Sequence, residues 1–496
     1  LQPPAVQPGS YTSFDYSPCV IRNRHLNPTA NEMSETKRDI GGLLLIYHCP
    51  IAKTPAFIED HIDSFREFSR HDVRTINTEL GFPDGLEEFE FQVLVLSFTL
   101  FAWKPFFISQ EFREYIQKSR AYKVAFFQDE YRFWPERTEF INGCNIDCVY
   151  SNIEPPYFDE TYRKLTSAKK VVHYIPGYVS TRQIEDGLRF SRPDREREID
   201  IGYRGRPTYH YMGKGAREKN VIATKFIEMA ADRGLVMNIE AAEEKRIYGE
   251  DWLRFLGNCR GVLGVEAGVS IFDLNDEMRP RYEKIMAERP DISFDEISGL
   301  LLHEYEDKGV YNRMISPRVF EAASVRACQI LFEGRYTGIL VPDVHYIPLK
   351  KDFSNIDDVI RKFRDPGIRK TLTDNAYRDL IESGKYSYEA FVEEFDRKFS
   401  DAGIVVSTDP TVAGKDVELL ILGHGYQRLF DLVAPGEEKY RDTLRDYVAL
   451  QYQYMDQQRQ LADLMRARPG YGIYFALRSK GARGLKKIKA LLTNKQ

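Results

Sequence analysis

The chain has 496 residues, of which 43% are hydrophobic and 29% are charged, and its formal net charge is −5. This composition is that of an ordinary globular protein, long enough for two or three domains. The negative net charge argues against a general nucleic-acid-binding protein. No apolar run approaches the roughly 20 residues that span a membrane.

The first 190 residues divide into a polar arm and a segment in which strands alternate with helices. Residues 1–40 are rich in Pro, Asn and Ser without a period, which predicts an arm over the surface. From 41 to 190 the alternation predicts a domain with a parallel sheet. Strands are expected at 43–47, 91–100, 124–127, 146–150 and 171–175, and helices at 58–68 and 112–116.

A charged, Pro-containing hinge at 191–198 is expected to begin a second domain that ends at 403. Within it, residues 271–314 form a partly helical insertion. The last helical stretch is rich in Tyr and Phe and suits packing back across the seam between the domains. Strands are expected at 199–203, 236–239, 261–265, 328–332 and after the Glu333-Gly334 turn, and helices at 218–233, 252–256, 317–325, 356–363 and 377–399.

Residues 404–496 are predicted to be a helical C-terminal extension. An apolar run suggests a strand at 416–422, and 440–466 is expected to be a long helix that serves as a hairpin arm or an oligomer surface. The segment 478–489 carries six basic residues and no acidic one. Such an end can lie on an anionic membrane, but a solvated terminal helix suits the pattern better.

The six cysteines do not form a metal-binding pattern. Only Cys144 and Cys148 lie close together, and no second ligand pair accompanies them, so no zinc site is predicted. Cys148 and Cys328 fall in expected strands, which indicates reduced, buried thiols and a cytoplasmic protein.

The most informative stretch is 315–351, which has the pattern of a turn, a helix and two strands. Ser316 is a good N-cap and Pro317 suits the first helical turn. Arg318 and Glu321 lie one turn apart near the start of this helix. That end of a helix is positively polarised and suits a phosphate group.

The segments SPRVFEAA and HYIPLKKDFSN in this stretch resemble the nucleotide-sugar half of GT-B glycosyltransferases, where a Glu and a run of small residues precede a strand. Among these enzymes, the two segments are most similar to the branch that contains the CgeB-like and group 1-like proteins. The resemblance covers 199–403 well and 41–180 loosely. It implies an α/β fold with two Rossmann-like domains facing across a cleft, the later one holding the nucleotide and the earlier one the acceptor.

The resemblance also implies roles in the donor site. Glu321 would accept hydrogen bonds from the ribose hydroxyls, as an acidic residue does in dinucleotide-binding folds. Arginine forks match phosphate oxygens, so basic residues after the strand at 199–203 are expected at the diphosphate, with a solvated basic loop as the alternative. The expected nucleotide-sugar-binding residues are Glu321, Arg318, Ser316, Arg204, Arg206, Lys214, Glu266 and Ser270. Arg217 and Lys219 follow Lys214 near the start of the next helix.

One position departs from the family pattern. Retaining GT-B enzymes often have a second Glu eight residues before the first, and this chain has Arg313 there. The usual retaining contact to the donor sugar is therefore in doubt. Glu266 and Ser270 follow the preceding strand and could fill the space, and for Glu266 a structural role is an equal alternative.

Three residues at strand ends of the first domain are candidate catalytic groups. A base is needed if an acceptor hydroxyl attacks in line with inversion. Asp129 is the first choice, Glu130 stands beside it, and His48 is the alternative, while a purely structural turn stays open. No Asp-any-Asp motif supports a metal, so arginines and helix ends are expected to stabilise the leaving diphosphate.

The hypothesis is a metal-independent glycosyltransferase without a cofactor, which moves a sugar from a nucleotide-diphosphate sugar to a glycan, glycolipid or metabolite in bacterial surface polysaccharide synthesis. Expected partners are the nucleotide sugar and a glycan or lipid-linked acceptor, with no nucleic acid. The basic C-terminus is also compatible with peripheral contact at the inner face of the membrane, and the long helix expected at 440–466 with a homo-oligomer. The alternative is a non-catalytic nucleotide-sugar or glycan-binding module. An epimerase or phosphorylase is disfavoured, since neither motif is present.

Overall fold

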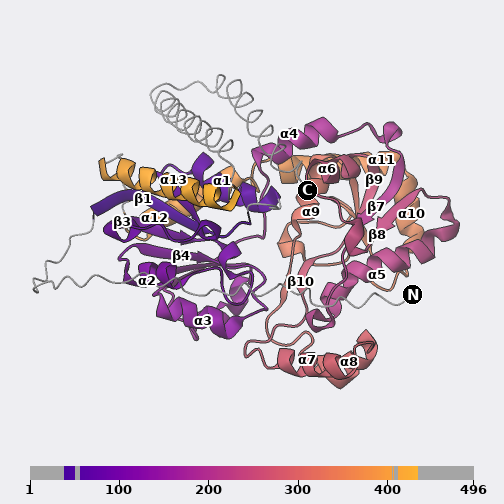
Figure 1. Cartoon of the computed structure of the whole chain (residues 1–496). Helices are drawn as coiled ribbons and strands as arrows, with labels where there is room; N and C mark the ends of the chain where they lie inside the picture. The colour runs from indigo at the N-terminus through magenta and orange to yellow at the C-terminus, as the bar shows by residue number, and fades with distance from the viewer. Residues whose placement is uncertain (1–37, 51–55, 405, 407–411, 434–496) are drawn as a thin grey trace, which may run out of the picture. The chain divides into compact units, whose positions relative to one another are not determined.

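The computed structural model describes residues 38–50, 56–404, 406 and 412–433. The chain divides into two compact units, residues 1–417 and 418–496. The first unit contains two parallel sheets with flanking helices, so the fold is α/β with two Rossmann-like domains, as predicted (Figure 1). Most of the predicted arm lies outside the described residues, and 38–40 already belong to a strand.

The first sheet has six parallel strands in the order β2-β1-β3-β4-β5-β6. The long apolar run predicted for its centre is buried, but the strand ends at Leu96. Ser97 stops it, because its side chain accepts a hydrogen bond from the Thr99 amide and begins a 3₁₀ turn. The strands are β1 (Arg38–Tyr47), β2 (Val73–Asn77), β3 (Phe89–Leu96), β4 (Tyr122–Phe126), β5 (Cys148–Ser151) and β6 (Lys170–His173).

The helices of the first sheet include one from the far end of the chain. In α12 (Tyr388–Asp401), Phe391, Phe395 and Phe399 recur every four residues and pack into the core of this sheet. The expectation that this aromatic stretch packs back across the seam is therefore confirmed. The other helices here are α1 (Ala56–Phe68), α2 (Gln110–Lys118) and α3 (Trp134–Gly143). The next helix, α4 (Thr181–Phe190), packs instead against helices of the second sheet.

The second sheet has five parallel strands in the order β13-β12-β9-β7-β8, and every strand predicted for it is present. The helix expected at 218–233 begins earlier, at the positive-φ residue Gly213. The strands are β7 (Ile199–Arg204), β8 (Met237–Glu240), β9 (Cys259–Gly264), β12 (Cys328–Phe332) and β13 (Ile347–Leu349). The helices are α5 (Gly213–Ala230), α6 (Glu250–Gly257), α9 (Pro317–Ser324), α10 (Ile356–Arg364) and α11 (Pro366–Tyr377).

The insertion at 271–314 has a small core of its own. It contains α7 (Met278–Glu288) and α8 (Phe294–Leu300), and Ser293 and Glu296 form a capping box at the start of α8. Its last residues form β11 (Asn312–Met314), which pairs antiparallel with β10 (Ala267–Val269). The partly helical character predicted for this segment is confirmed.

The strand predicted at 416–422 is wrong, because these residues lie within α13 (Val412–Val433). A short apolar run has no periodicity that separates a strand from a helix, and here the helix extends far beyond the run. The helix predicted at 440–466 and the basic segment 478–489 lie outside the described residues. Within the described part of the chain, no helix combines the length and the hydropathy needed to cross a membrane.

Candidate functional site

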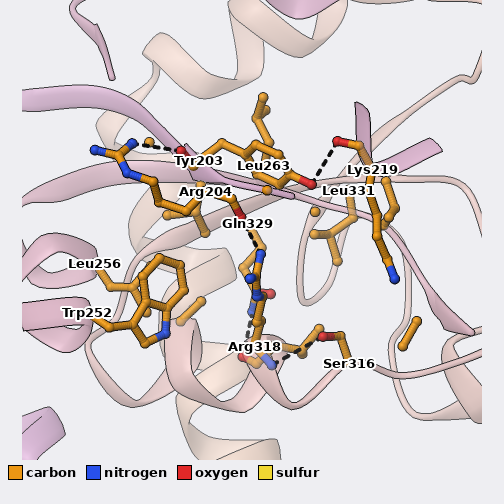
Figure 2. A pocket seen from close by; sticks show the side chains of 18 of the residues that line it. Tyr203, Arg204, Lys219, Trp252, Leu256, Leu263, Ser316, Arg318, Gln329 and Leu331 are labelled. Carbon is orange, nitrogen blue, oxygen red and sulfur yellow. Dashed lines mark hydrogen bonds between the residues drawn. The ribbon is translucent and has the colours of Figure 1, made fainter. Parts of the chain in front are cut away.

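A pocket lies at the carboxyl ends of the central strands of the second sheet. β7 and β9 are neighbours there although β8 lies between them in sequence, so the chain leaves them in opposite directions. Ligands of open α/β sheets bind at such a switch point. The cavity has a volume of about 180 Å³ and is lined by the ends of β7, β9 and β12 and by α5, α6 and α9 (Figure 2).

Five basic side chains and no acidic one line this pocket. Arg246 has an acidic partner on the neighbouring loop at 2.5 Å, and Arg318 donates to the main-chain oxygen of Arg204. Arg206 and Lys219 make no side-chain hydrogen bond or ion pair with any residue that the structure describes. Apart from the ion pair of Arg246, no hydrogen-bonded carboxylate balances the positive charge of this lining, which suits an anion.

Lys219 is the residue on which this field acts most. Burial and, after it, the guanidinium of Arg206 lower the pKa of its ammonium group to about 8. The carboxylate of Asp129 opposes the shift, whereas Arg318 adds to it. A bound phosphate would restore the charged form, because it supplies the negative charge that the pocket lacks.

Glu321 is held by a residue of the pocket wall. Its Oε2 accepts a hydrogen bond of 2.7 Å from Nε1 of Trp252, and the guanidinium carbon of Arg318 lies 5.3 Å from the centre of the same indole ring. Burial raises the pKa of the Glu321 carboxyl. Oε1 has no partner among the described residues, so one carboxylate oxygen remains for a ligand.

Arg204 lines the pocket, but its guanidinium is turned to the sheet side. It donates to the main-chain oxygen of Tyr203 at 2.8 Å (Figure 2). It also donates to the main-chain and amide oxygens of Asn238 at 2.9 and 2.8 Å, and it lies over the Phe255 ring. These contacts use donors of both terminal nitrogens, whereas Nε is buried and has no partner among the described residues. The geometry therefore favours Arg206 and Lys219 over Arg204 as phosphate ligands.

The start of α5 is already filled by a carboxylate of the insertion. Glu306 accepts from the Lys214 amide at 3.0 and 3.2 Å and from the Ser270 hydroxyl, and that hydroxyl accepts from the Gly215 amide at 2.7 Å. A negative side chain at a helix N-terminus satisfies its free N–H groups. Lys214 and Ser270 thus lie together at a helix cap, outside the lining of the pocket.

Glu266 is buried in a structural network. It accepts from the amides of Arg335 and Tyr336 at 3.0 and 2.9 Å and from the hydroxyl of Tyr311. Arg313, which stands where the family has its second Glu, makes a bidentate ion pair with Glu218. These hydrogen bonds favour the structural role for Glu266. The ion pair with Glu218 neutralises the charge of Arg313 within the protein.

The turn after β4 separates the two predicted acidic candidates. Asp129 has a left-handed backbone with φ of 49°, and its carboxylate makes no hydrogen bond with a described residue. Tyr131 in the same turn packs against Met212 and Ala216 at the start of α5. Asp129 is therefore an exposed carboxylate whose charge acts on Lys219 across this contact.

Glu130 is buried and fully hydrogen-bonded. It accepts from the Ser151 hydroxyl at 2.5 Å, from the Asn152 amide at 2.9 Å and from the Tyr162 hydroxyl. Burial raises its pKa to about 7, against which these hydrogen bonds and the nearby Arg137 guanidinium act. Such surroundings suit a carboxyl that fixes the turn rather than one that meets a substrate.

This raised pKa predicts a pH-dependent stability. The folded state keeps a proton on Glu130 that the unfolded state releases above about pH 4.5, so its stabilising contribution is present at low pH and is lost as the pH rises through 7. We expect wild type to lose about 2 kcal/mol of unfolding free energy between pH 5 and 7 relative to Glu130→Gln. Urea unfolding followed by near-UV circular dichroism measures this difference.

The matched control is Glu139→Gln, which changes an exposed carboxyl on α3 and should keep the wild-type pH dependence. Parallel pH profiles of wild type and Glu130→Gln would contradict the assignment.

His48 lies where β1 ends beside β3, the switch point of the first sheet. Its ring stacks on Phe107 with centroids 3.8 Å apart, and its nitrogens face Thr78 at 3.2 Å and Glu79 at 3.6 Å. Burial lowers the pKa of this imidazole. A neutral ring beside a carboxylate can accept a proton, so the geometry leaves His48 as a candidate base.

Sequence reasoning did not single out Trp252 or Arg246 and treated Lys219 as one basic residue among several. Trp252 is one of three tryptophans in the chain, which was the available signal. No sequence pattern predicts that its indole meets Glu321, because the two residues are 69 positions apart. Among the described residues, no three His, Cys, Asp or Glu side chains gather as a metal site.

No protein-family model matches this chain, and no curated protein matches it in sequence. Solved structures of glycosyltransferases resemble it loosely. An α-glucosyltransferase in complex with UDP and a 13-mer DNA containing an HMU base has a TM-score of 0.42 and 11% identity, over 73% of this chain and 99% of that chain. Sucrose-phosphate synthase from Thermosynechococcus elongatus has a TM-score of 0.40 and 11% identity, over 73% and 98%.

Anabaena HepE in complex with UDP and glucose has a TM-score of 0.40 and 9% identity, over 73% of this chain and 100% of that chain. Likeness at this level does not assign an activity. The functional reading rests on the pocket of the second sheet.

Proposed function

We propose that this chain is a metal-independent glycosyltransferase of the GT-B type, which transfers a sugar from a nucleotide-diphosphate sugar to a glycan, glycolipid or metabolite acceptor. The observation that carries the proposal is the positive charge of Arg206 and Lys219 at the β7/β9 switch point, in a pocket whose wall residue Trp252 donates a hydrogen bond to the carboxylate of Glu321. A nucleoside diphosphate has the complementary groups, since it offers phosphates to the cations and ribose hydroxyls to the carboxylate.

The chemistry follows from where charge develops. When the bond between the sugar and the diphosphate breaks, negative charge appears on the leaving phosphate, and Arg206 and Lys219 would stabilise it without a metal. Asp129, whose charge acts on Lys219, would accept the proton of the attacking hydroxyl. His48 is the second candidate for that base, at the carboxyl edge of the first sheet.

A panel of nucleotides tests the donor class. We expect UDP, GDP or dTDP to raise the melting temperature of the full chain by several degrees at saturating concentration, whereas the corresponding nucleosides raise it less because they lack the phosphates. Release of nucleotide from the matching nucleotide sugar, with and without an acceptor mixture, separates a transferase from a binding module. No stabilisation by any member would refute the donor site.

The lowered pKa of Lys219 gives the donor site a pH dependence. Only the protonated amine attracts a phosphate, and half of the amine has lost its proton at its pKa of about 8. We expect the affinity for UDP to be about tenfold lower at pH 9 than at pH 7, because binding above the pKa must first return that proton. Calorimetric titration at both pH values measures the ratio.

Lys219→Met should bind UDP more weakly and with nearly equal affinity at the two pH values. A tenfold loss that persists in this variant would assign the titration to another group.

A further inference from the structure

A second cavity, of about 210 Å³, lies beside the loop that follows β7. It belongs to neither the nucleotide pocket nor the acceptor candidates of the first sheet. Its wall combines that loop, one side of α5 and the first residue of α8, namely Thr208, Tyr209, His210, Arg217, Asn220 and Phe294. The insertion thus contributes an aromatic ring to a second site on the nucleotide domain.

The charge of this cavity is balanced, unlike that of the nucleotide pocket. Arg217 pairs with Asp295 at 2.9 Å and lies over the Phe294 ring at 4.4 Å. His210 is kept neutral, because burial lowers the pKa of its imidazole and Arg217 lowers it further. No acidic side chain lines the cavity, and its one cation is compensated. The expected ligand is therefore neutral.

Two buried polar atoms in the wall have no hydrogen-bond partner among the described residues. They are Nδ1 of His210 and Oδ1 of Asn220. Buried polar atoms in proteins are almost always paired, so unpaired ones in a cavity wall point to a ligand or water. The amide oxygen only accepts hydrogen bonds, whereas the neutral ring nitrogen donates or accepts according to its tautomer. A hydroxyl group satisfies both, because it donates and accepts.

The remaining wall is aromatic. Phe294 is buried, whereas Tyr209 is 64% exposed and stacks parallel to Tyr211 with centroids 5.4 Å apart. Aromatic faces pack against apolar C–H surfaces and leave polar edges free. A pyranose ring has C–H groups on its faces and hydroxyls at its rim, so it matches both parts of the wall.

We infer that this cavity is a subsite for one neutral hexose ring, separate from the donor pocket. The two cavities are lined by neighbouring residues. Arg206 and Lys219 line the donor pocket, whereas Thr208 and Asn220 line this cavity. A sugar here would be a unit of a bound glycan rather than the sugar of the nucleotide. Binding at this subsite does not require transfer, so the inference stands apart from the proposed function.

Saturation-transfer difference NMR on the full chain tests the inference with methyl α-D-glucopyranoside, methyl α-D-galactopyranoside and methyl N-acetyl-α-D-glucosaminide, each offered alone. We expect ring-proton signals from at least one of them, reduced at least about fivefold in Tyr209→Ala and in Asn220→Ala. Tyr209→Ala changes an exposed side chain and should not disturb folding. Lys225→Ala, an exposed change on the same helix, should keep the wild-type signals.

Excess UDP or inorganic phosphate should leave the signals unchanged. Both are anions, which we expect to bind in the donor pocket and not in a cavity that takes a neutral ligand. The inference is overturned by the absence of signal from all three glycosides, by signals that persist in both variants, or by competition from UDP or phosphate. Failure of UDP to bind the chain would refute the donor site and would leave the glycoside result as an independent test of this cavity.

Discussion

Glu321→Ala is expected to weaken the binding of UDP by more than about 100-fold, since hydrogen bonds to a charged group contribute about 1.5 to 3 kcal/mol each and the ribose offers two hydroxyls. The variant also leaves Nε1 of Trp252 without its 2.7 Å partner. Uridine should lose affinity to a similar degree, because the lost contact is to the ribose. Isothermal titration calorimetry with both ligands measures the two ratios.

Glu333→Ala is the matched control, because it removes an exposed carboxylate at the end of β12 and should bind UDP as wild type does. Equal UDP affinity in wild type and Glu321→Ala would refute the assignment of Glu321 to the ribose hydroxyls. The main argument that α9 contacts a nucleotide would then be lost.

The double variant Arg206→Ala/Lys219→Met is expected to lose at least about 100-fold in affinity for UDP, because two charge-assisted contacts to phosphate are removed at once. Uridine binding should change little, since uridine carries no phosphate. Pyrophosphate should follow UDP. This pattern differs from that expected for Glu321→Ala, in which UDP and uridine lose affinity to a similar degree, so the two variants distinguish the phosphate contacts from the ribose contact.

Lys225→Met is the control for the double variant, as it removes one exposed ammonium from α5 without touching the pocket. Melting curves of all variants verify that they fold. A double variant that loses uridine and UDP equally would indicate a damaged pocket rather than lost phosphate contacts.

The helix and the two strands predicted within 315–351 are present as α9, β12 and β13, because the sequence signals for them are local. Ser316 caps α9 by accepting from the Arg318 amide, and Arg318 then lies one turn from Glu321. Helix periodicity and capping depend on residues three or four apart, so they can be derived from sequence. The alternation of strands and helices predicted both sheets for the same reason.

Long-range contacts decided which of the predicted residues face the pocket. Arg204 and Arg206 are both arginines after β7, yet Asn238 of the neighbouring strand holds the first, and the second makes no side-chain pair within the described chain. Likewise, Glu306 fills the helix end beside Lys214. These partners are 34 and 92 positions away, beyond any pattern in one sequence.

The amino-acid sequence by itself determined the α/β architecture, most strand positions and the capped helix α9, because local periodicity, capping and apolar runs specify these features. Only the tertiary structure decided that Lys219 is the low-pKa cation, that Trp252 holds Glu321, and that Glu130 and Glu266 are buried in structural networks. The physical reason is that a charge is defined by its surroundings, and burial and partner charges come from residues that folding brings together from distant parts of the chain.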